Sequence, residues 1–423
     1  MKTSTTVILA LPMLLGGFVQ FVVSQFYQKF ATDTLLLDSA IIGAIFFASR
    51  ATDAVLDPVC GYWSDRLRRR RVFIGLGLFA LAGGLILAFL PALEVFAGAT
   101  TAKYAMAAVG IFTLYLGVTL VYIPHYAWLA ALQRVLPKLP FFASRVVTEN
   151  FGTILGGVAL GLLVPLQEKS APMLVYAVVA MLLPLVLVGS IPVMLYNDPV
   201  TPVDAAGHSF SRALAKLAEN RRFALVAAMS FFNQFAATTL LAVSLYYTDY
   251  VLGNKELGVT LAVVFLLSAT LFVPLWSLLA RRTSRLKLWM LALAAIVCIF
   301  PTVLLTQAGH TWYLTVFAVL VGGFAGAVIL FVPQEVAFTT GGKDTEEGLY
   351  FAAFTFVNKS AMACAPLVIG VALSLAGYNP AQRVASVGQT ITLLFVGVPA
   401  LAFLISAILL KAYTKATRAA APR

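Results

Sequence analysis

The sequence predicts an all-α membrane protein with twelve transmembrane helices in two pseudo-symmetric six-helix bundles. Of its 423 residues, 61% are hydrophobic and only 11% are charged, whereas about 25% of residues are charged in an ordinary soluble domain. The mean hydropathy is +0.94. Apolar runs recur along the whole chain at the length of about 20 residues that a helix needs to cross a bilayer. This composition excludes a soluble enzyme, a nucleic-acid-binding protein and a disordered regulator.

The apolar runs form two sets of six, separated by a polar stretch. The first set covers residues 7–30, 38–61, 72–91, 103–131, 142–166 and 172–195. The second set covers residues 222–250, 257–280, 286–306, 311–338, 349–376 and 386–411. We therefore predict an N-terminal bundle at 1–196, a cytoplasmic linker at 197–221 with a short amphipathic helix at 211–220, and a C-terminal bundle at 222–423.

The first run is expected to be a transmembrane helix and not a secretory signal peptide. It follows Lys2, as the hydrophobic part of a signal peptide would, but it is long and has no clean small-residue cleavage site. More apolar runs follow it. The chain is therefore expected to enter the bilayer with its first helix.

Basic residues predict how the chain is oriented. When the loops are assigned alternately to the two faces, 21 of the 29 lysines and arginines fall on the face of the N-terminus and five on the other. Because basic loops stay in the cytoplasm, both termini are expected there, in a bacterial inner membrane. This bias also explains the net charge of +12 without a nucleic-acid partner.

A weak internal repeat relates the two halves. At an offset of 216 residues, Thr32–Asp33 corresponds to Thr248–Asp249, and Pro58 and Arg66 correspond to Pro274 and Arg282. Two acidic residues do not repeat, because Asp53 corresponds to Ala269 and Asp57 to Val273. Related bundles with a site between them are typical of transporters that work by alternating access. The coupling chemistry is expected mainly in the N-terminal half.

Three ionisable residues share one face of the predicted helix 38–61. Arg50, Asp53 and Asp57 are spaced by three and four residues. A charge in the bilayer is costly and usually functional. Two carboxylates one turn apart repel each other, so one is expected to hold a proton unless a cation lies between them. The pair therefore predicts a proton or weak Na⁺ site, with a static ion-pair cluster around Arg50 as the alternative.

Lys359 lies deep in the apolar run 349–376. A lysine in this position needs a negative partner, and Asp53 and Asp57 are the candidates across the bundle. Such a lysine could yield to the coupling cation in another conformation, or it could simply hold the halves together.

The fourth and fifth predicted helices carry candidate solute-binding residues. The run 103–131 has a polar and aromatic face with a proline bend, formed by Thr119, Tyr122, Pro124, His125, Tyr126 and Trp128. Such a face suits stacking and hydrogen bonding of a solute. His125 could bind a proton near neutral pH or be a buried, hydrogen-bonded residue. In the run 142–166, Arg145 and Glu149 could pair with each other, or Arg145 could bind an anionic or hydroxyl-rich substrate. Gln20, Arg50 and Asn358 complete the candidate substrate-binding set.

The loop after the second predicted helix has the sequence GYWSDRLRRRR, from Gly61 to Arg71. It is either a plain cluster of cytoplasmic basic residues or a conformational latch. In the second case Gly61 allows close approach of helices, and Asp65 and Arg66 bind neighbouring helices in one conformation.

Nothing in the sequence favours an enzyme or a bound cofactor. The chain has no GxxxxGK[ST], HExxH or GxSxG motif. Its cysteines, Cys60, Cys298 and Cys364, lie in apolar runs without metal-binding or paired spacing. A membrane enzyme that uses His125 and Glu149 would lack a second catalytic group at a suitable spacing. A receptor that only binds would not need a buried set of two aspartates and a lysine.

Three motifs carry a family resemblance over the whole chain. The loop Gly61–Arg71 resembles the signature loop of the major facilitator superfamily. The strings RATDAVLDP at 50–58 and EGLYFAAFTFVNK at 347–359 resemble motifs of the melibiose-permease-like glycoside–pentoside–hexuronide:cation symporters, as does Thr32–Asp33 at the end of the first helix. The resemblance implies the major facilitator fold. It also implies that Asp53, Asp57, Thr119 and Lys359 belong to the cation site.

The chain departs from that family's pattern at several positions. The asparagine before the second aspartate is Leu56 here, and the fourth-helix aspartate aligns with Tyr122. The sugar-binding aspartate of the first helix aligns with Gly17, and a stacking tryptophan with Tyr126. These losses remove oxygen ligands that Na⁺ needs, whereas a proton needs only the carboxylates. The expected coupling ion is therefore H⁺, with Na⁺ as the alternative.

The sequence thus predicts a cation-coupled symporter that imports a small solute, a sugar or glycoside, by alternating access. One alternative is transport of an amphipathic, lysolipid-like or other organic solute, suggested by Gly17 and the aromatic residues Phe231, Phe232 and Trp276. Proton-driven efflux is another. The expected partners are the solute and the lipid bilayer, with the chain acting as a monomer.

Overall fold

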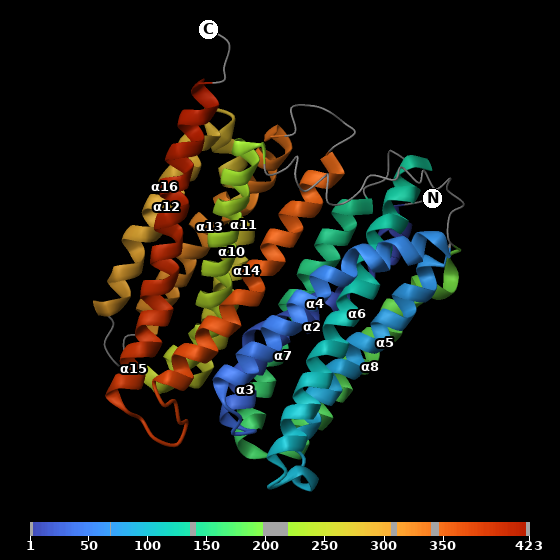
Figure 1. The fold of residues 1–423 in the computed structure, drawn as a ribbon, viewed down its shortest axis with the longest axis vertical. Helices are drawn as coiled ribbons and strands as arrows, with labels where there is room; N and C mark the ends of the chain where they lie inside the picture. Colours follow the sequence, from blue (N-terminus) through green and yellow to red (C-terminus); the bar gives the residue numbers. More distant parts are fainter. Residues whose placement is uncertain are drawn as a thin grey trace. The chain divides into compact units, whose positions relative to one another are not determined.

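The computed structural model describes residues 3–67, 69–135, 141–197, 219–305, 311–339 and 347–419. The described chain is helical throughout, with no strand in any of these ranges. It divides into two compact units, Met1–Ala205 and Ala206–Arg423. In Figure 1 the helices coloured blue to green belong to the N-terminal unit, and those coloured yellow-green to red belong to the C-terminal unit. The predicted amphipathic helix at 211–220 lies largely outside the described residues, as does most of the predicted linker.

The N-terminal unit is built from the first half of the chain. Its long helices are α4 (Ser39–Arg66), α5 (Arg70–Phe89), α6 (Thr100–Val135), α7 (Phe141–Lys169) and α8 (Ala171–Leu195). Two short 3₁₀ turns, η2 (Leu90–Ala92) and η3 (Glu94–Phe96), lead from α5 into α6. Within the unit, α6 packs against both α4 and α5. This packing brings the charged face of α4 next to the polar face of α6.

The first predicted helix is interrupted. It consists of α1 (Thr3–Ala10), α2 (Pro12–Val22), the π-helical turn η1 (Val23–Tyr27) and α3 (Gln28–Asp33). Pro12 has no N–H to continue the hydrogen-bond ladder of α1, and Leu11 forms a turn in which its N–H donates to the Ile8 carbonyl. The helix therefore restarts at Pro12, and α2 packs against α7 and α8.

The C-terminal unit has the same general plan. It contains α10 (Arg221–Tyr246), η4 (Tyr247–Val251), α11 (Lys255–Ala280), α12 (Arg285–Ile299), η5 (Phe300–Leu305) and α13 (Thr311–Thr339). It ends with α14 (Glu347–Leu375), α15 (Ala385–Thr392), η6 (Leu393–Gly397) and α16 (Val398–Ala419). In this unit α13 packs against α11 and α12, and α16 packs against α10 and α12.

Eleven helical segments of the described chain are long and apolar enough to cross a membrane. The remaining predicted transmembrane helix, the first in the chain, corresponds to the interrupted segment from α1 to α3. Large apolar side chains such as Phe79, Leu195 and Leu271 are exposed, as expected where lipid and not water surrounds a helix. The prediction of an all-α transmembrane protein is confirmed.

Polar caps mark where several helices begin. The Asp38 carboxylate accepts hydrogen bonds from the backbone N–H groups of Ala40 and Ile41 at the start of α4. Asn220 and Asn254 cap α10 and α11 in the same way. These side chains satisfy N–H groups that have no partner within the helix, so each helix starts at a defined residue after a short connection.

Glycines let pairs of helices approach until their backbones touch. A Cβ atom at Gly17 of α2 would lie 2.1 Å from the Glu149 carbonyl oxygen of α7, and one at Gly152 would lie 2.1 Å from the Leu14 carbonyl oxygen. In the C-terminal unit, α11 and α13 meet at Gly322 and Gly326. Small residues at helix contacts are the usual packing device in membranes. Gly161, also on α7, has open space around it.

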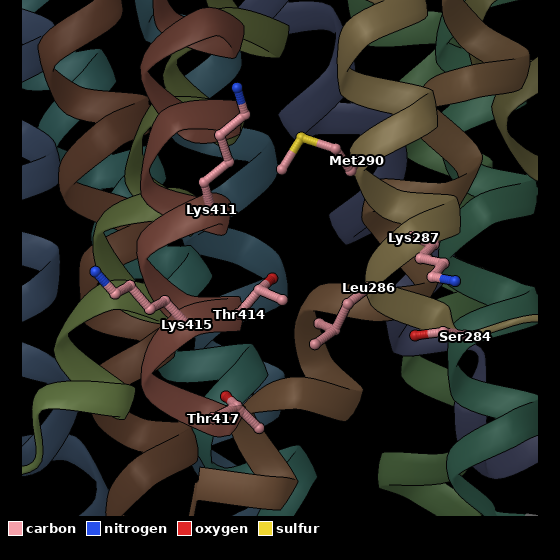
Figure 2. A pocket seen from close by; sticks show the side chains of 8 residues that line it. All are labelled: Ser284, Leu286, Lys287, Met290, Lys411, Thr414, Lys415 and Thr417. Carbon is pink, nitrogen blue, oxygen red and sulfur yellow. The ribbon is translucent and has the colours of Figure 1, made fainter. Parts of the chain in front are cut away.

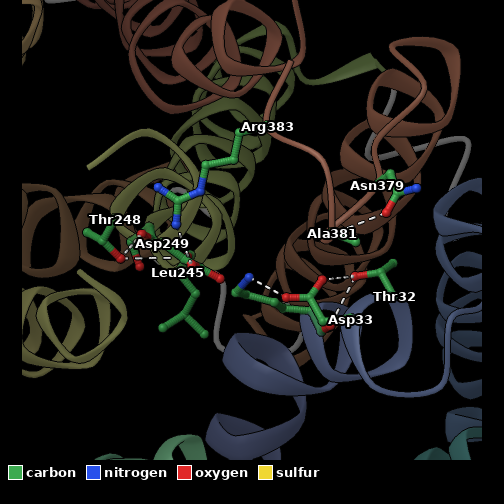
Figure 3. Close-up of polar contacts among 10 residues, drawn as sticks. Thr32, Asp33, Leu245, Thr248, Asp249, Asn379, Ala381 and Arg383 are labelled. Atoms are coloured by element: carbon green, nitrogen blue, oxygen red, sulfur yellow. Dashed lines mark hydrogen bonds and ion pairs between the residues drawn. The ribbon is translucent and has the colours of Figure 1, made fainter. Parts of the chain in front are cut away.

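The repeated Thr–Asp pair lies at the end of the first helical segment of each unit (Figure 3). In the N-terminal unit, the Thr32 hydroxyl donates to Asp33 at 3.1 Å, and Asp33 forms an ion pair with Lys29. In the C-terminal unit, Asp249 forms an ion pair with Arg383 at 3.8 Å. The Thr248 hydroxyl donates to the Ser244 carbonyl. Each aspartate therefore has a basic partner within its own unit, although the partners come from unrelated positions.

The close contact of α2 with α7 yields a stability prediction. The variant G152A should lower the apparent melting temperature of the purified protein, because overpacking a helix contact costs about 1–3 kcal/mol. The control G161A lies on the same helix in open space, and alanine is favoured over glycine in a helix by about 0.5–1 kcal/mol. Thermal unfolding in detergent measures both, and equal melting temperatures would contradict the described contact.

Candidate functional site

Two carboxylates of α4 share one hydroxyl of α6. The Thr119 side chain lies within hydrogen-bond distance of both Asp53 and Asp57, and its oxygen is 3.1 Å from Oδ1 of Asp57. Thr119 and Asp53 are buried and Asp57 is partly buried. We call these three residues the carboxylate–threonine cluster. The three-and-four spacing along α4 and the packing of α4 on α6 bring them together.

Arg50 lies on the same face of α4, and its guanidinium is stacked on an aromatic ring. The Arg50 Cζ atom is 4.2 Å from the centre of the Tyr115 ring, a geometry that attracts a cation to the ring face. Both residues are buried. Tyr115 lies one turn before Thr119 on α6, so the arginine sits at one end of the carboxylate–threonine cluster. The sequence analysis did not identify Tyr115, although its spacing of four from Thr119 was a usable signal.

A second cluster joins α6 to α7. Arg145 Nη1 pairs with Glu149 Oε2 at 3.0 Å, and the Tyr122 hydroxyl donates to Glu149 Oε1 at 2.9 Å. The Arg145 guanidinium also covers the Tyr126 ring, with Cζ 3.7 Å from the ring centre. We call Tyr122, Tyr126, Arg145 and Glu149 the tyrosine–arginine cluster. The first of the two alternatives for Arg145 and Glu149, a mutual pair, therefore describes this conformation.

The residues of this cluster differ in their exposure and in their unused hydrogen-bond donors. Arg145 is 2% exposed, and its Nε and Nη2 groups have no hydrogen-bond acceptor among the described residues. Tyr126 is 44% exposed. Gln20 of α2 is half-buried and contacts Tyr122. The cluster thus combines unused N–H donors with an accessible aromatic ring.

Two proposed features of the solute cavity are corrected by the structure. Gly17 does not open space, because the α7 backbone at Glu149 fills the position that a side chain would occupy. Trp276 is buried in the C-terminal unit, where its Nε1–H donates to the Gly323 carbonyl oxygen at 2.7 Å. Neither residue lines a cavity, so Gly17 and Trp276 no longer support the transport of an amphipathic solute. Phe231 is half-buried and stacks with Phe235 on α10.

His125 and Trp128 are both fully buried. Nε2 of His125 lies 2.8 Å from the Leu9 carbonyl oxygen. Since a carbonyl only accepts, Nε2 carries the hydrogen of this bond. The ring edge faces Trp128. This arrangement fits the alternative of a buried, hydrogen-bonded histidine, and it leaves neither ring exposed to a solute in this conformation.

The latch prediction is only partly within the described structure. A Cβ atom at Gly61 would lie 3.4 Å from a side-chain carbon of Ile123. That is an ordinary contact, so the close helix approach expected at Gly61 is not present. The side chains of Asp65 and Arg66 lie outside the described part of the chain, and their role stays a prediction.

In the C-terminal unit, α14 carries the remaining predicted residues. The Ser230 hydroxyl of α10 donates to Asn358 Oδ1 at 2.6 Å, and Lys359 is half-buried next to it. The pairing of Lys359 with Asp53 and Asp57 depends on how the two units are arranged, so it stays a prediction. Sequence reasoning missed Asn233, which lies one turn after Ser230. It is buried, and its amide atoms have no hydrogen-bond partner among the described residues.

The two units differ at equivalent positions. Ala269, which corresponds to Asp53, is buried on α11, and its carbonyl oxygen is 2.5 Å from where a Cβ of Gly326 would lie. The helix pair that holds polar groups in the N-terminal unit is therefore closed by backbone contact in the C-terminal unit. This difference gives a structural reason for the asymmetry of charge between the halves.

Two helical units with a repeated sequence signal, together with charged side chains buried among membrane-spanning helices, define a secondary transporter. The sequence matches the family described as MFS/sugar transport protein over residues 8–414. The chain therefore belongs to this family of the major facilitator superfamily, and the resemblance seen in its motifs is confirmed. It is an integral membrane transporter and not an enzyme.

Individual relatives agree with this assignment. The chain is 26% identical to the inner membrane symporter YicJ of Escherichia coli (strain K12), over 93% of this chain and 88% of YicJ. Its fold is similar to that of a mutant of the nucleoside transporter NupG, with a TM-score of 0.72, 15% identity and coverage of 96% and 98%. The D-xylose–proton symporter is similar with a TM-score of 0.68, 13% identity and coverage of 95% and 96%.

The shared hydroxyl of the carboxylate–threonine cluster can be tested by a matched pair of variants. T119V should lower the free energy of unfolding by about 1–3 kcal/mol, because it removes the hydroxyl that contacts both carboxylates of α4. The control T148V should have a smaller effect, because that hydroxyl donates only to the Ser144 carbonyl of its own helix. Thermal unfolding compares them, and equal losses would contradict a bridging role for Thr119.

Proposed function

We propose that this protein is a proton-coupled symporter that imports a sugar-like solute by alternating access. The observation that carries the coupling step is the single Thr119 hydroxyl between the Asp53 and Asp57 carboxylates. The solute class is supported by the tyrosine–arginine cluster and by the family match. Lys359 is proposed to compete with the coupling ion for the carboxylates. We further propose that the protein acts as a monomer with cytoplasmic termini.

Counting hydrogens favours a proton on the carboxylate pair. A hydroxyl has one hydrogen to donate and lone pairs to accept with. If both aspartates are ionised, the Thr119 hydroxyl can donate to only one of them. The contact between its oxygen and the other carboxylate then has no hydrogen between two acceptor oxygens. If one aspartate is protonated, its O–H donates to the threonine oxygen and the threonine donates to the other aspartate. Both contacts then contain a hydrogen, so the geometry suits a pair that holds one proton.

Charge balance leads to the same state. Arg50 contributes one positive charge beside the two carboxylates, and in the conformation in which Lys359 has left them a second positive charge is still needed. A net charge within the membrane is costly, and one bound proton removes it. Na⁺ would also neutralise the cluster, but it needs several oxygen ligands, and Leu56 adds none next to Asp57. The proton is therefore the favoured coupling ion.

The tyrosine–arginine cluster supports a hydroxyl-bearing ring as the solute. The exposed Tyr126 ring offers a stacking face, and the Nε and Nη2 groups of Arg145, which are buried in this conformation, could donate to solute hydroxyls once the cluster opens. Gly17 and Trp276 no longer support an apolar cavity, because the α7 backbone fills the space beside Gly17 and Trp276 is buried in the C-terminal unit. We therefore favour a sugar or glycoside over an amphipathic solute.

Proton coupling can be measured as a solute-induced pH change in proteoliposomes, screened over sugars and glycosides, with lysolipids as the competing class. An inward gradient of the transported solute should make the external medium more alkaline. D53N/D57N should abolish this signal, because neither amide side chain can carry the proton. The control D38N replaces Asp38 by asparagine, which can also cap the start of α4. This variant should retain the signal.

Two results would contradict proton coupling. One is a pH change that persists in D53N/D57N. The other is uptake that depends on Na⁺ without any pH change, which would make Na⁺ the coupling ion. Export of a preloaded solute that is driven by an inward-directed proton gradient would instead identify proton-driven efflux.

Stacking on Tyr126 predicts a specific loss of apparent affinity. Y126A should raise the half-saturating solute concentration about 2–10-fold, which corresponds to the roughly 0.5–1.5 kcal/mol of an aromatic contact. Tyr176 is an exposed tyrosine on α8, so Y176A is a matched control that should leave this concentration unchanged. Uptake kinetics in proteoliposomes measure both variants, and equal effects would argue against Tyr126 as a stacking surface.

A further inference from the structure

A basic cavity lies in the C-terminal unit, far along the chain from the residues used for transport. It has a volume of about 630 Å³ and lies between the start of α12 and the end of α16. Three lysines line it: Lys287 on α12, and Lys411 and Lys415 on α16. Figure 2 shows Leu286, Met290 and Thr414 beside the gap between the helices, whereas the amines of Lys287 and Lys415 point away from it in this conformation. These lysines are exposed, so their flexible stems can reach a ligand in the cavity.

Within the described ranges, the residues that line this cavity carry three positive charges and no negative one. Neither α12 nor α16 contains an aspartate or glutamate. The carboxylate of Glu335 lies nearby on α13, but it is buried and bound by the Tyr413 hydroxyl at 2.9 Å and by Arg285 at 3.7 Å. Ser284, where α12 begins, also lines the cavity, so the positive end of the helix dipole adds to the field. The cavity therefore attracts an anion.

The surroundings of the cavity are apolar in the direction of the membrane. On α16, the exposed side chains of Leu404 and Ile408 precede Lys411 and Lys415 on one face of the helix. On α12, the exposed Leu291 follows Lys287 by one turn. Exposed apolar side chains at these positions contact acyl chains, and the lysines lie where those chains end. A ligand that matches both parts has an anionic head and hydrocarbon tails.

We propose that this cavity binds the head group of an anionic phospholipid such as phosphatidylglycerol or cardiolipin. The ammonium groups of the three lysines hold the phosphate by charge-assisted hydrogen bonds. The acyl chains follow the exposed apolar faces of α12 and α16. The bound lipid joins two helices that pack against each other in this unit, so it also stabilises their contact.

Native mass spectrometry of the detergent-purified protein tests this site directly. Dioleoyl phosphatidylglycerol should bind more tightly than dioleoyl phosphatidylethanolamine, whose head group has no net charge. K411Q/K415Q should weaken phosphatidylglycerol binding about thirtyfold, since a lysine near an anionic lipid contributes roughly fivefold. The control R281Q/R282Q removes two exposed charges from the turn after α11, at the same end of the unit and outside the cavity lining. It should change binding less than twofold.

The variant K411R/K415R keeps the charges and should restore binding, which separates the role of charge from any effect on folding. Equal losses in K411Q/K415Q and R281Q/R282Q would overturn the proposal, because they would indicate a general attraction to a basic surface. Unchanged binding in K411Q/K415Q would also overturn it. Displacement of the lipid by millimolar inorganic phosphate would overturn it too, since the cavity would then be a site for a soluble anion.

Discussion

Charged side chains in a lipid bilayer need partners within the protein, and this requirement organises the N-terminal unit. Arg50 is stacked on Tyr115, both aspartates of α4 contact Thr119, and Arg145 pairs with Glu149. The contacts of Arg50 and of the two aspartates join α4 to α6, whereas the Arg145–Glu149 pair lies within α7 and contacts Tyr122 and Tyr126 of α6. The packing of α6 against α4 is therefore the condition for the carboxylate–threonine cluster. Moving α6 would expose several charges to hydrocarbon at once.

The two polar clusters are connected through the same helix. Thr119 of the carboxylate–threonine cluster and Tyr122 of the tyrosine–arginine cluster are three residues apart on α6. A proton bound near Asp57 and a solute bound near Tyr126 would thus act on adjacent turns of one helix, on the two sides of Pro124. This gives a physical route by which the proposed ion and solute sites affect each other without direct contact.

The helical fold could be predicted from the sequence because membrane helices need long apolar runs, and these runs stand out in the chain. The π-helical turn at 23–27 could not, because apolar content does not report backbone hydrogen bonds, whereas the break at Pro12 had a signal in the proline itself. The pairing of Arg145 with Glu149 was one of two alternatives. Gly17 was misread, because a glycine that opens a cavity and one that lets two backbones touch look the same in a sequence. The partner of Lys359 depends on the arrangement of the two units, which no local pattern contains.

The contact between Ala269 and Gly326 has an evolutionary consequence. An ancestor with two equal halves would have had equivalent positions at 53 and 269. In this contact the Ala269 carbonyl oxygen takes the place of a side chain at position 326, so α13 offers no polar partner there. A single mutation of Ala269 back to aspartate would bury a charge within the membrane, which is costly without a partner. The loss of symmetry is therefore irreversible by one substitution, and later selection could adjust the ion site only in the N-terminal half.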